Sequence, residues 1–293
     1  MLRRRSIAMI ALTLLAVGWG SIPLIVREDV PWQGLVTARV WLGAFTLFLL
    51  MAATRQLRLP DTHRLQIVIA GALLAVHWAT FFWAIKLTSV AVALAVVFLG
   101  PVTAAVLAPR FLGEQVASRV YWALGVAFSG VVLVVAFEEG GADESTWAGV
   151  GIAVVSALTV SGLLLVSKAA VDVVGPLVVT AGELAVASLV LSPFLGTAIS
   201  GTIDNPLPLL TLGILLTGIG YLIFWTATRE LPVAVVSVLM HIEPASAVVL
   251  ALIFLSETPA PWQWVGIGLV ITGGLLAAGD AAEEEVLSAP ANL

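Results

Sequence analysis

Long apolar runs alternate with short polar connectors along almost the whole chain. A helix needs about 20 residues to cross about 30 Å of hydrocarbon. Runs of that length cover residues 7–26, 34–53, 65–85, 90–108, 119–137, 147–167, 174–195, 206–227, 233–255 and 261–279. The connectors carry the turn formers and charges, as in RQLRLPDTHR and EEGGADES, and leave no room for a soluble domain. The pattern predicts an all-α integral membrane protein with ten transmembrane helices.

The pattern is also duplicated. The stretch 98–114, FLGPVTAAVLAPRFLGE, aligns with 241–257, HIEPASAVVLALIFLSE, at a spacing of 143 residues. Each copy holds five spans, an odd number, so the second copy must enter the membrane from the opposite face. We expect two inverted five-helix repeats, residues 1–137 and 147–279, with the substrate bound at the midplane where they meet. An external connector would cover 138–146, and an acidic, disordered cytoplasmic tail would cover 280–293.

Composition and charge support this class and orient it. Hydrophobic residues make up 60% of the chain, charged residues only 11%, and the mean hydropathy is +1.11, which excludes a soluble domain. Basic residues favour the cytoplasmic side. Those that fall on one side of the ten-span arrangement are Arg3, Arg4, Arg5, Arg55, Arg58, Arg64, Arg110, Arg119, Lys168 and Arg229. Only Arg27 and Lys86 fall on the other side, so both termini are predicted to be cytoplasmic. The Arg-rich start also fits a signal peptide, although no small-residue cleavage site follows it.

Three features together resemble a known family. Each half has an apolar helix containing a central proline, a Leu-x-Glu ending at Glu114 or Glu257, and a glycine-rich fifth helix. These features are similar to the EamA repeats of the drug/metabolite transporter superfamily, and the resemblance covers nearly the whole chain. Within it the chain is most similar to the YddG type of aromatic amino acid exporters. The resemblance implies a bacterial inner membrane, ten helices and export of small metabolites.

Polar and aromatic residues at membrane depth indicate where a substrate would bind, because ionisable groups there normally face a cavity or a partner. The residues expected to line a central pocket are His77, Trp78, Phe81, Phe82, Trp19, Phe98, Gly100, Tyr221, Trp225, His241 and Glu243. Trp78 and Phe82 share a helix face, and such a wall suits an aromatic side chain or an ammonium group. Each aromatic residue can equally be a packing residue.

Two prolines at equivalent positions are candidate hinges. Pro101 and Pro244 cannot donate to the carbonyls of Val97 and Met240, so each helix turn should open. The opened turns could bend around a substrate and allow rocking, or could simply shape helix packing. Glu114 and Glu257 are expected to cap helix ends or loops, with transport chemistry as the alternative.

The intramembrane charges leave several roles open. His241 and Glu243 lie about 200° apart around their helix, so one of them should face another helix. Glu243 could bond the opened turn or act on substrate or protons. Glu183 could carry a proton, bind an ammonium group, or form an ion pair with Arg39 or a histidine.

Other residues have simpler interpretations. Tryptophans at span ends are expected to anchor the interfaces: Trp32, Trp83, Trp122, Trp147, Trp262 and Trp264. Glycines in the last span of each repeat allow close helix approach, with each other or in a homodimer: Gly125, Gly130, Gly266, Gly268, Gly273 and Gly274.

The sequence gives little support for an enzyme or for an ATP-driven pump. The chain has no cysteine and only three histidines, and it lacks HExxH, Gly-x-Ser-x-Gly and P-loop motifs. We expect no cofactor, no metal ion and no nucleic acid, and a monomer or homodimer in the bilayer. The expected function is export of aromatic and other neutral amino acids and related small metabolites by alternating access. The alternatives are a broad-specificity drug or metabolite/proton antiporter, or a receptor.

Overall fold

The computed structural model describes residues 2–25, 30–57, 60, 62–88, 90–135, 144–255 and 260–288. These residues form helices and short connections, with no strand among them. The first half contains α1 (Leu2–Trp19), α2 (Ile22–Ile25), α3 (Trp32–Ala53), α4 (Arg64–Leu87), α5 (Val90–Val97), α6 (Leu99–Leu112) and α7 (Ser118–Val135). The second half begins with α8 (Glu144–Val174), α9 (Pro176–Val190), a short 3-10 turn η1 (Ser192–Phe194), α10 (Leu195–Asp204) and α11 (Pro206–Leu210). It continues with a π-helix η2 (Thr211–Ile219), α12 (Gly220–Glu230), α13 (Val233–Met240), α14 (Ile242–Leu255) and α15 (Pro261–Ser288).

Several of these helices can cross a membrane. In the described ranges five stretches are long and apolar enough, namely 32–53, 64–87, 147–174, 206–230 and 233–254. A sixth results if Pro176–Val190 and Ser192–Asp204, which meet at 63°, form one span. Large apolar side chains such as Trp122 (77% exposed) and Leu207 (76%) face outward, as lipid contact requires. The chain is therefore a multi-pass membrane protein, and the count of ten spans stays a prediction.

The helical stretches that contain Pro101 and Pro244 are both interrupted at the turn where the proline cannot donate a hydrogen bond. α5 ends at Val97 and α13 ends at Met240, the residues whose carbonyls the prolines cannot serve. α6 and α14 then restart after Phe98 and His241, which are themselves 143 positions apart. The prediction that these turns open is confirmed.

The predicted disorder of the acidic tail is wrong for its described part. α15 continues without a break through Asp280 to Ser288. Ala, Glu and Leu dominate this segment and are strong helix formers, and no Gly or Pro occurs in it after Asp280. Residues 289–293 lie outside the described residues.

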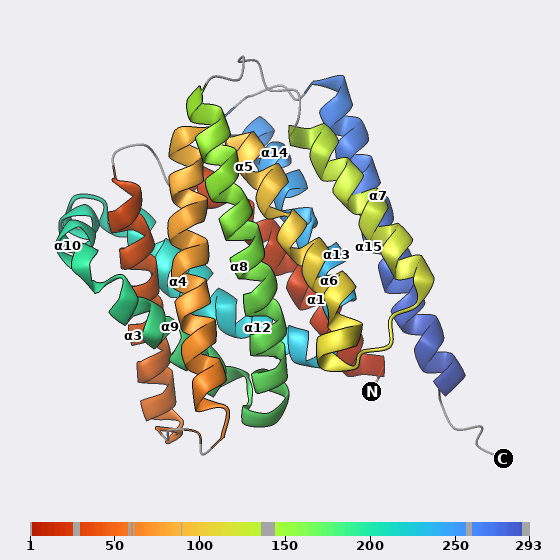
Figure 1. Ribbon diagram of the computed structural model, residues 1–293, viewed down its shortest axis with the longest axis horizontal. Coiled ribbons are helices and arrows are strands. Elements are labelled where there is room, and N and C mark those ends of the chain that lie inside the picture. The colour runs from red at the N-terminus through yellow and green to blue at the C-terminus, as the bar shows by residue number, and fades with distance from the viewer. Residues whose placement is uncertain are drawn as a thin grey trace.

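The helices pack in pairs that match under exchange of the two halves. α7 packs on α15 and α3 on α9, and each of these two pairs joins equivalent helices. α6 packs on α13, so contact is also made between the two interrupted stretches, α5 with α6 and α13 with α14. The contact of α4 with α8 has its counterpart in α1 with α12, and that of α4 with α9 in α3 with η2. α7 and α15 lie side by side at one edge of the bundle and run in opposite directions (Figure 1). The start of α1 and the end of α15 lie toward the same end of the bundle.

The contact between α7 and α15 is reciprocal residue by residue. A Cβ on Gly130 would lie 2.6 Å from the Gly266 carbonyl oxygen, and one on Gly273 would lie 2.7 Å from the Ala123 oxygen. Positions 130 and 273, like 123 and 266, are 143 apart, so each contact is the image of the other. Such reciprocity is what a twofold relation produces. Gly125 and Gly268 border open space instead.

We predict that Gly130→Ala lowers the melting temperature of the detergent-purified protein, because the new methyl group would meet the backbone of α15. Gly125→Ala on the same helix is the matched control. It should leave the melting temperature unchanged or raise it, since alanine is favoured over glycine in a helix by about 1 kcal/mol. A thermal-shift series in which Gly130→Ala behaves like Gly125→Ala would contradict the packing.

Two charged side chains hold the connection between α12 and α13. Lys168 Nζ donates to the carbonyl oxygens of Thr228 (2.7 Å) and Arg229 (3.2 Å) at the end of α12. Glu114 Oε2 accepts from the Val233 N–H at 2.8 Å, at the first turn of α13. Burial raises the pKa of the Glu114 carboxyl, while the Val233 N–H acts in the opposite direction. The helix-capping role expected for Glu114 is confirmed, and Glu257 lies outside the described residues.

Replacing Glu114 by alanine should destabilise the protein by about 0.5–2 kcal/mol, the usual range for a lost helix cap. Glu114→Gln should retain most of the stability, because its amide oxygen can still accept from Val233. Chemical or thermal unfolding in detergent compares the two variants, and equal stability of Ala and Gln would show that the cap contributes nothing.

Candidate functional site

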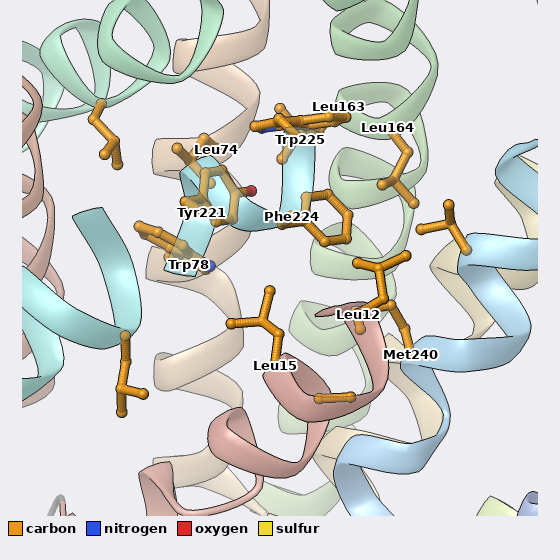
Figure 2. Close-up of a cluster of buried hydrophobic side chains, with 14 of the residues drawn as sticks. Leu12, Leu15, Leu74, Trp78, Leu163, Leu164, Tyr221, Phe224, Trp225 and Met240 are labelled. Carbon is orange, nitrogen blue, oxygen red and sulfur yellow. The ribbon is translucent and has the colours of Figure 1, made fainter. Parts of the chain in front are cut away.

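Aromatic side chains from both halves meet in the interior. Trp19 of α1, Trp78 of α4 and Tyr221 of α12 are in ring contact, with centroids 6.1 Å apart for Trp19–Tyr221 and 5.4 Å for Trp78–Tyr221. Phe224 lies 5.7 Å from Trp19 and 5.8 Å from Tyr221. Figure 2 shows Trp78 next to Tyr221, with Phe224 alongside. We call Trp19, Trp78, Tyr221 and Phe224 the aromatic cluster.

The π-helix positions one wall of this cluster. In η2 the backbone bonds are shifted by one residue, and the Gly220 N–H reaches the Leu215 carbonyl. The Leu216 carbonyl accepts from Trp19 Nε1 at 2.8 Å. π-helical turns are rare and occur frequently at functional sites. This bond fixes the indole of Trp19 against the second half of the chain.

Arg39 lies on the face of Trp78. Its guanidinium carbon is 3.8 Å from the Trp78 ring centroid and 5.7 Å from that of Phe82. Arg39 Nε donates to Thr217 Oγ1 of η2 at 3.2 Å. The side chain is only 5% exposed. The prediction that Trp78 and Phe82 share one helix face is confirmed, because both rings face the same guanidinium.

His77 and Phe81 face a different helix. His77 Nδ1 lies 2.8 Å from Ser156 Oγ of α8, and Ser156 Oγ donates to the His77 carbonyl at 3.0 Å. The Phe81 ring stacks on His77 at 6.2 Å. The four α4 residues expected to line the central pocket therefore form two pairs on different faces of the helix, although the rings of Phe81 and Phe82 are in contact at 5.2 Å. Only Trp78 and Phe82 face Arg39.

Glu183 has different partners from those expected. Its two carboxylate oxygens accept from Ser167 of α8 and from Trp225 Nε1 of α12, the latter at 2.9 Å. Both Glu183 and Trp225 are fully buried. Of the three alternatives for Glu183, the ion pair does not form in the described part of the chain, where no salt bridge joins it to Arg39 or to a histidine. Ring contact of Trp225 with Tyr221 (6.2 Å) connects this group to the aromatic cluster.

The two break residues of the interrupted helices touch. The rings of Phe98 and His241 are 5.3 Å apart, edge to face, and Phe128 lies 6.2 Å from His241. His241 Nδ1 lies 2.6 Å from the Ser237 carbonyl, while its Nε2 is buried without a partner among the described residues. Two equivalent residues can contact each other only if they lie close to the twofold axis that exchanges the halves. Ser237 Oγ donates to the Pro101 carbonyl at 2.9 Å and so joins the two interrupted helices.

Gly100 and Glu243 occupy equivalent positions with different surroundings. A Cβ on Gly100 would lie 2.6 Å from the Ala157 carbonyl, so glycine permits α6 to approach α8. Glu243 is half-buried on α14, and its backbone carbonyl would lie 2.7 Å from a Cβ on Gly20. Pro244 is buried and Pro101 half-buried. His241 and Glu243 face different neighbours, as their angular separation predicts.

Some site residues escape sequence reasoning. Phe224 could have been found from its spacing of three from Tyr221. Thr217, Ser156 and Ser167 carry no signal, because small hydroxyl residues are common in apolar helices. Within the described ranges no three His, Asp or Glu side chains gather as metal ligands.

We predict that removing the Trp225 hydrogen bond to buried Glu183 lowers the stability of the protein. Trp225→Phe keeps the ring but removes the donor, which leaves one carboxylate oxygen without a partner at a cost of about 1–3 kcal/mol. Trp122→Phe, at an outward-facing position, is the control and should be neutral. Equal thermal stability of the two variants in detergent would contradict the role given to the Trp225 hydrogen bond.

Comparison with known proteins adds to this geometry. Residues 6–136 and 147–279 each match the EamA-like transporter family. The chain is 26% identical over 279 residues to the "Uncharacterized transporter YxxF" of Bacillus subtilis (strain 168), covering 92% of this chain and 89% of that protein. It is 26% identical over 243 residues to the "Uncharacterized transporter YwfM" of the same organism, covering 81% of each. A solved crystal structure shares the fold with a TM-score of 0.79 at 19% identity, over 92% of this chain and 98% of that one.

Proposed function

The chain belongs to the EamA-like transporter family, and we propose that it exports aromatic and other neutral amino acids across a bacterial inner membrane. Family membership implies membrane transport of small molecules. The finer assignment rests on one observation, the ring contacts of Trp19 and Trp78 with Tyr221 across the two halves, with Arg39 on the face of Trp78. Aromatic rings favour aromatic substrates through ring contacts of about 0.5–1.5 kcal/mol beyond area burial.

We propose ten membrane crossings in two inverted repeats, with both termini in the cytoplasm. The reciprocal glycine contacts and the opposite directions of α7 and α15 support this arrangement. The positions of the basic residues support the orientation. Inverted repeats place a substrate site near the midplane, where their interface lies.

Alternating access would use the two interrupted helices. Pro101 and Pro244 follow the breaks at Phe98 and His241, and the breaks contact each other. Rocking of one bundle against the other would change the angles at both breaks together. The aromatic cluster is nearly closed to solvent in this structure, with Trp78 5% and Tyr221 6% exposed, which suits an occluded stage of such a cycle.

For energy coupling we propose export down the substrate gradient. Glu183 already accepts two hydrogen bonds from Ser167 and Trp225, which favours a structural role over proton carriage. Flux of labelled tryptophan, phenylalanine, threonine and methionine in proteoliposomes tests this with and without a pH gradient. A pH gradient that drives substrate accumulation would overturn the uncoupled mechanism in favour of proton antiport.

Trp78→Ala should reduce phenylalanine and tryptophan flux about two- to tenfold more than threonine flux, from the loss of one ring contact. Counterflow of labelled substrate measures this and also distinguishes a carrier from a receptor. Trp122→Ala, on the outer surface of α7, is the matched control and should leave all fluxes unchanged. An equal loss for every substrate in Trp78→Ala would make Trp78 a packing residue only.

A further inference from the structure

Arg39 is a buried cation with most of its donors unused. A guanidinium has five N–H donors, and in the described part of the chain the only hydrogen bond from Arg39 is Nε to Thr217. No carboxylate forms an ion pair with it among the described residues. Its remaining contacts are the faces of Trp78 and Phe82. A buried charge held only in this way is costly, because the attraction of a cation to an aromatic face is weaker than the penalty of removing that cation from water.

Glu243 carries the opposite charge and also lacks a hydrogen-bond partner in the described part of the chain. It is half-buried on α14 just after the break at His241, and its backbone packs against Gly20, the residue that follows Trp19 of the aromatic cluster. Equivalent position 100 in the first half is a glycine. The carboxylate is thus a feature of one half only and is not needed for the shared helix packing.

Neither charged end is completely enclosed, although the Arg39 side chain as a whole is only 5% exposed. Among the described residues the fully enclosed polar side-chain atoms without a partner are His63 Nδ1, Thr88 Oγ1 and His241 Nε2. The terminal nitrogens of Arg39 and the carboxylate oxygens of Glu243 are not in that group. They are therefore unpaired but not completely enclosed, in contrast to Glu183, whose oxygens are both bonded.

We propose that Arg39 binds the carboxylate and Glu243 the ammonium group of a zwitterionic α-amino acid, whose side chain contacts Trp78 and Tyr221. This rests on the proposed function and identifies what the site recognises. Arg39 offers the planar pair of N–H groups that fits a carboxylate. A bound zwitterion would neutralise both protein charges at once, whereas an amine or an acid alone would leave one of them unpaired.

The experiment compares three ligands that share one ring: phenylalanine, phenylalaninamide, which lacks the carboxylate, and 3-phenylpropionate, which lacks the ammonium group. Binding to the purified protein is measured by competition against labelled phenylalanine and by isothermal titration calorimetry. Wild-type protein should bind phenylalanine at least tenfold more tightly than either analogue. Equal affinity for phenylalanine and phenylalaninamide in the wild type would overturn the proposal without any variant.

Variants of Arg39 and Glu243 test which residue binds each charged group of the ligand. Arg39→Gln should weaken phenylalanine binding at least tenfold and leave phenylalaninamide almost unchanged, and Arg39→Lys should restore part of the preference. Glu243→Gln should instead abolish the preference over 3-phenylpropionate. If Arg39→Gln weakens all three ligands equally, Arg39 is structural and the proposal fails. Size-exclusion profiles confirm folding, and Arg39→Lys replaces Arg39→Gln as the decisive variant if the latter does not fold.

The outcome separates this proposal from the proposed function. In one outcome the wild type transports phenylalanine while Arg39→Gln and Arg39→Lys keep the preference for a carboxylate. The exporter proposal then stands, and the assignment of Arg39 to the substrate carboxylate is overturned. Absence of phenylalanine flux in the wild type, together with binding of 3-phenylpropionate alone, would overturn amino acid export and with it the zwitterion site.

Discussion

Lipid offers no hydrogen-bond partner, so every polar group inside this bundle must find one within the protein, on its own helix or on another. Most of them do. Glu183 accepts from two other helices, Lys168 binds the end of α12, and Trp19 bonds a carbonyl of the π-helix. These contacts fix the positions of helices that are apolar on all sides and could otherwise rotate or slide. Arg39 and Glu243 are conspicuous against this background because their charged ends stay unpaired in the described part of the chain, and a substrate can therefore complete them.

The two halves are related by contacts as well as by sequence. Gly130 and Gly273 make image contacts across α7 and α15, and the break residues Phe98 and His241 touch each other. A duplicated chain that packs reciprocally has two equal ways to tilt one half against the other. We propose that the differences between the halves determine what the site binds. Glu243 replaces Gly100, and α12 is preceded by a π-helix that has no counterpart at α4. In the proposed transport cycle, the symmetry of the two halves would allow the motion, and the departures from symmetry would form the substrate site.

The sequence predicted the features that depend on local geometry. The prolines interrupt their helices at the turns whose hydrogen bonds they remove, Trp78 and Phe82 share a face, and Glu114 caps a helix. Features that depend on how one helix is rotated against another were not predicted. Glu183 pairs with Trp225 rather than Arg39, and His77 turns toward Ser156, because an almost wholly apolar helix has no polar face to fix its rotation. The π-helix leaves no sequence signature, and the helical tail followed intrinsic propensity rather than its charge.

The proposed transport cycle depends most on the inversion of the repeats, and the absence of cysteine makes that inversion directly measurable. Ser118 and Pro261 are exposed first residues of α7 and α15, at equivalent positions 143 apart. Single variants Ser118→Cys and Pro261→Cys would be treated with a membrane-impermeant maleimide in intact and in permeabilised cells. Inverted repeats predict labelling of Pro261→Cys from outside and of Ser118→Cys only after permeabilisation. Labelling of both positions from the same side of the membrane would contradict the inversion and the alternating access that depends on it.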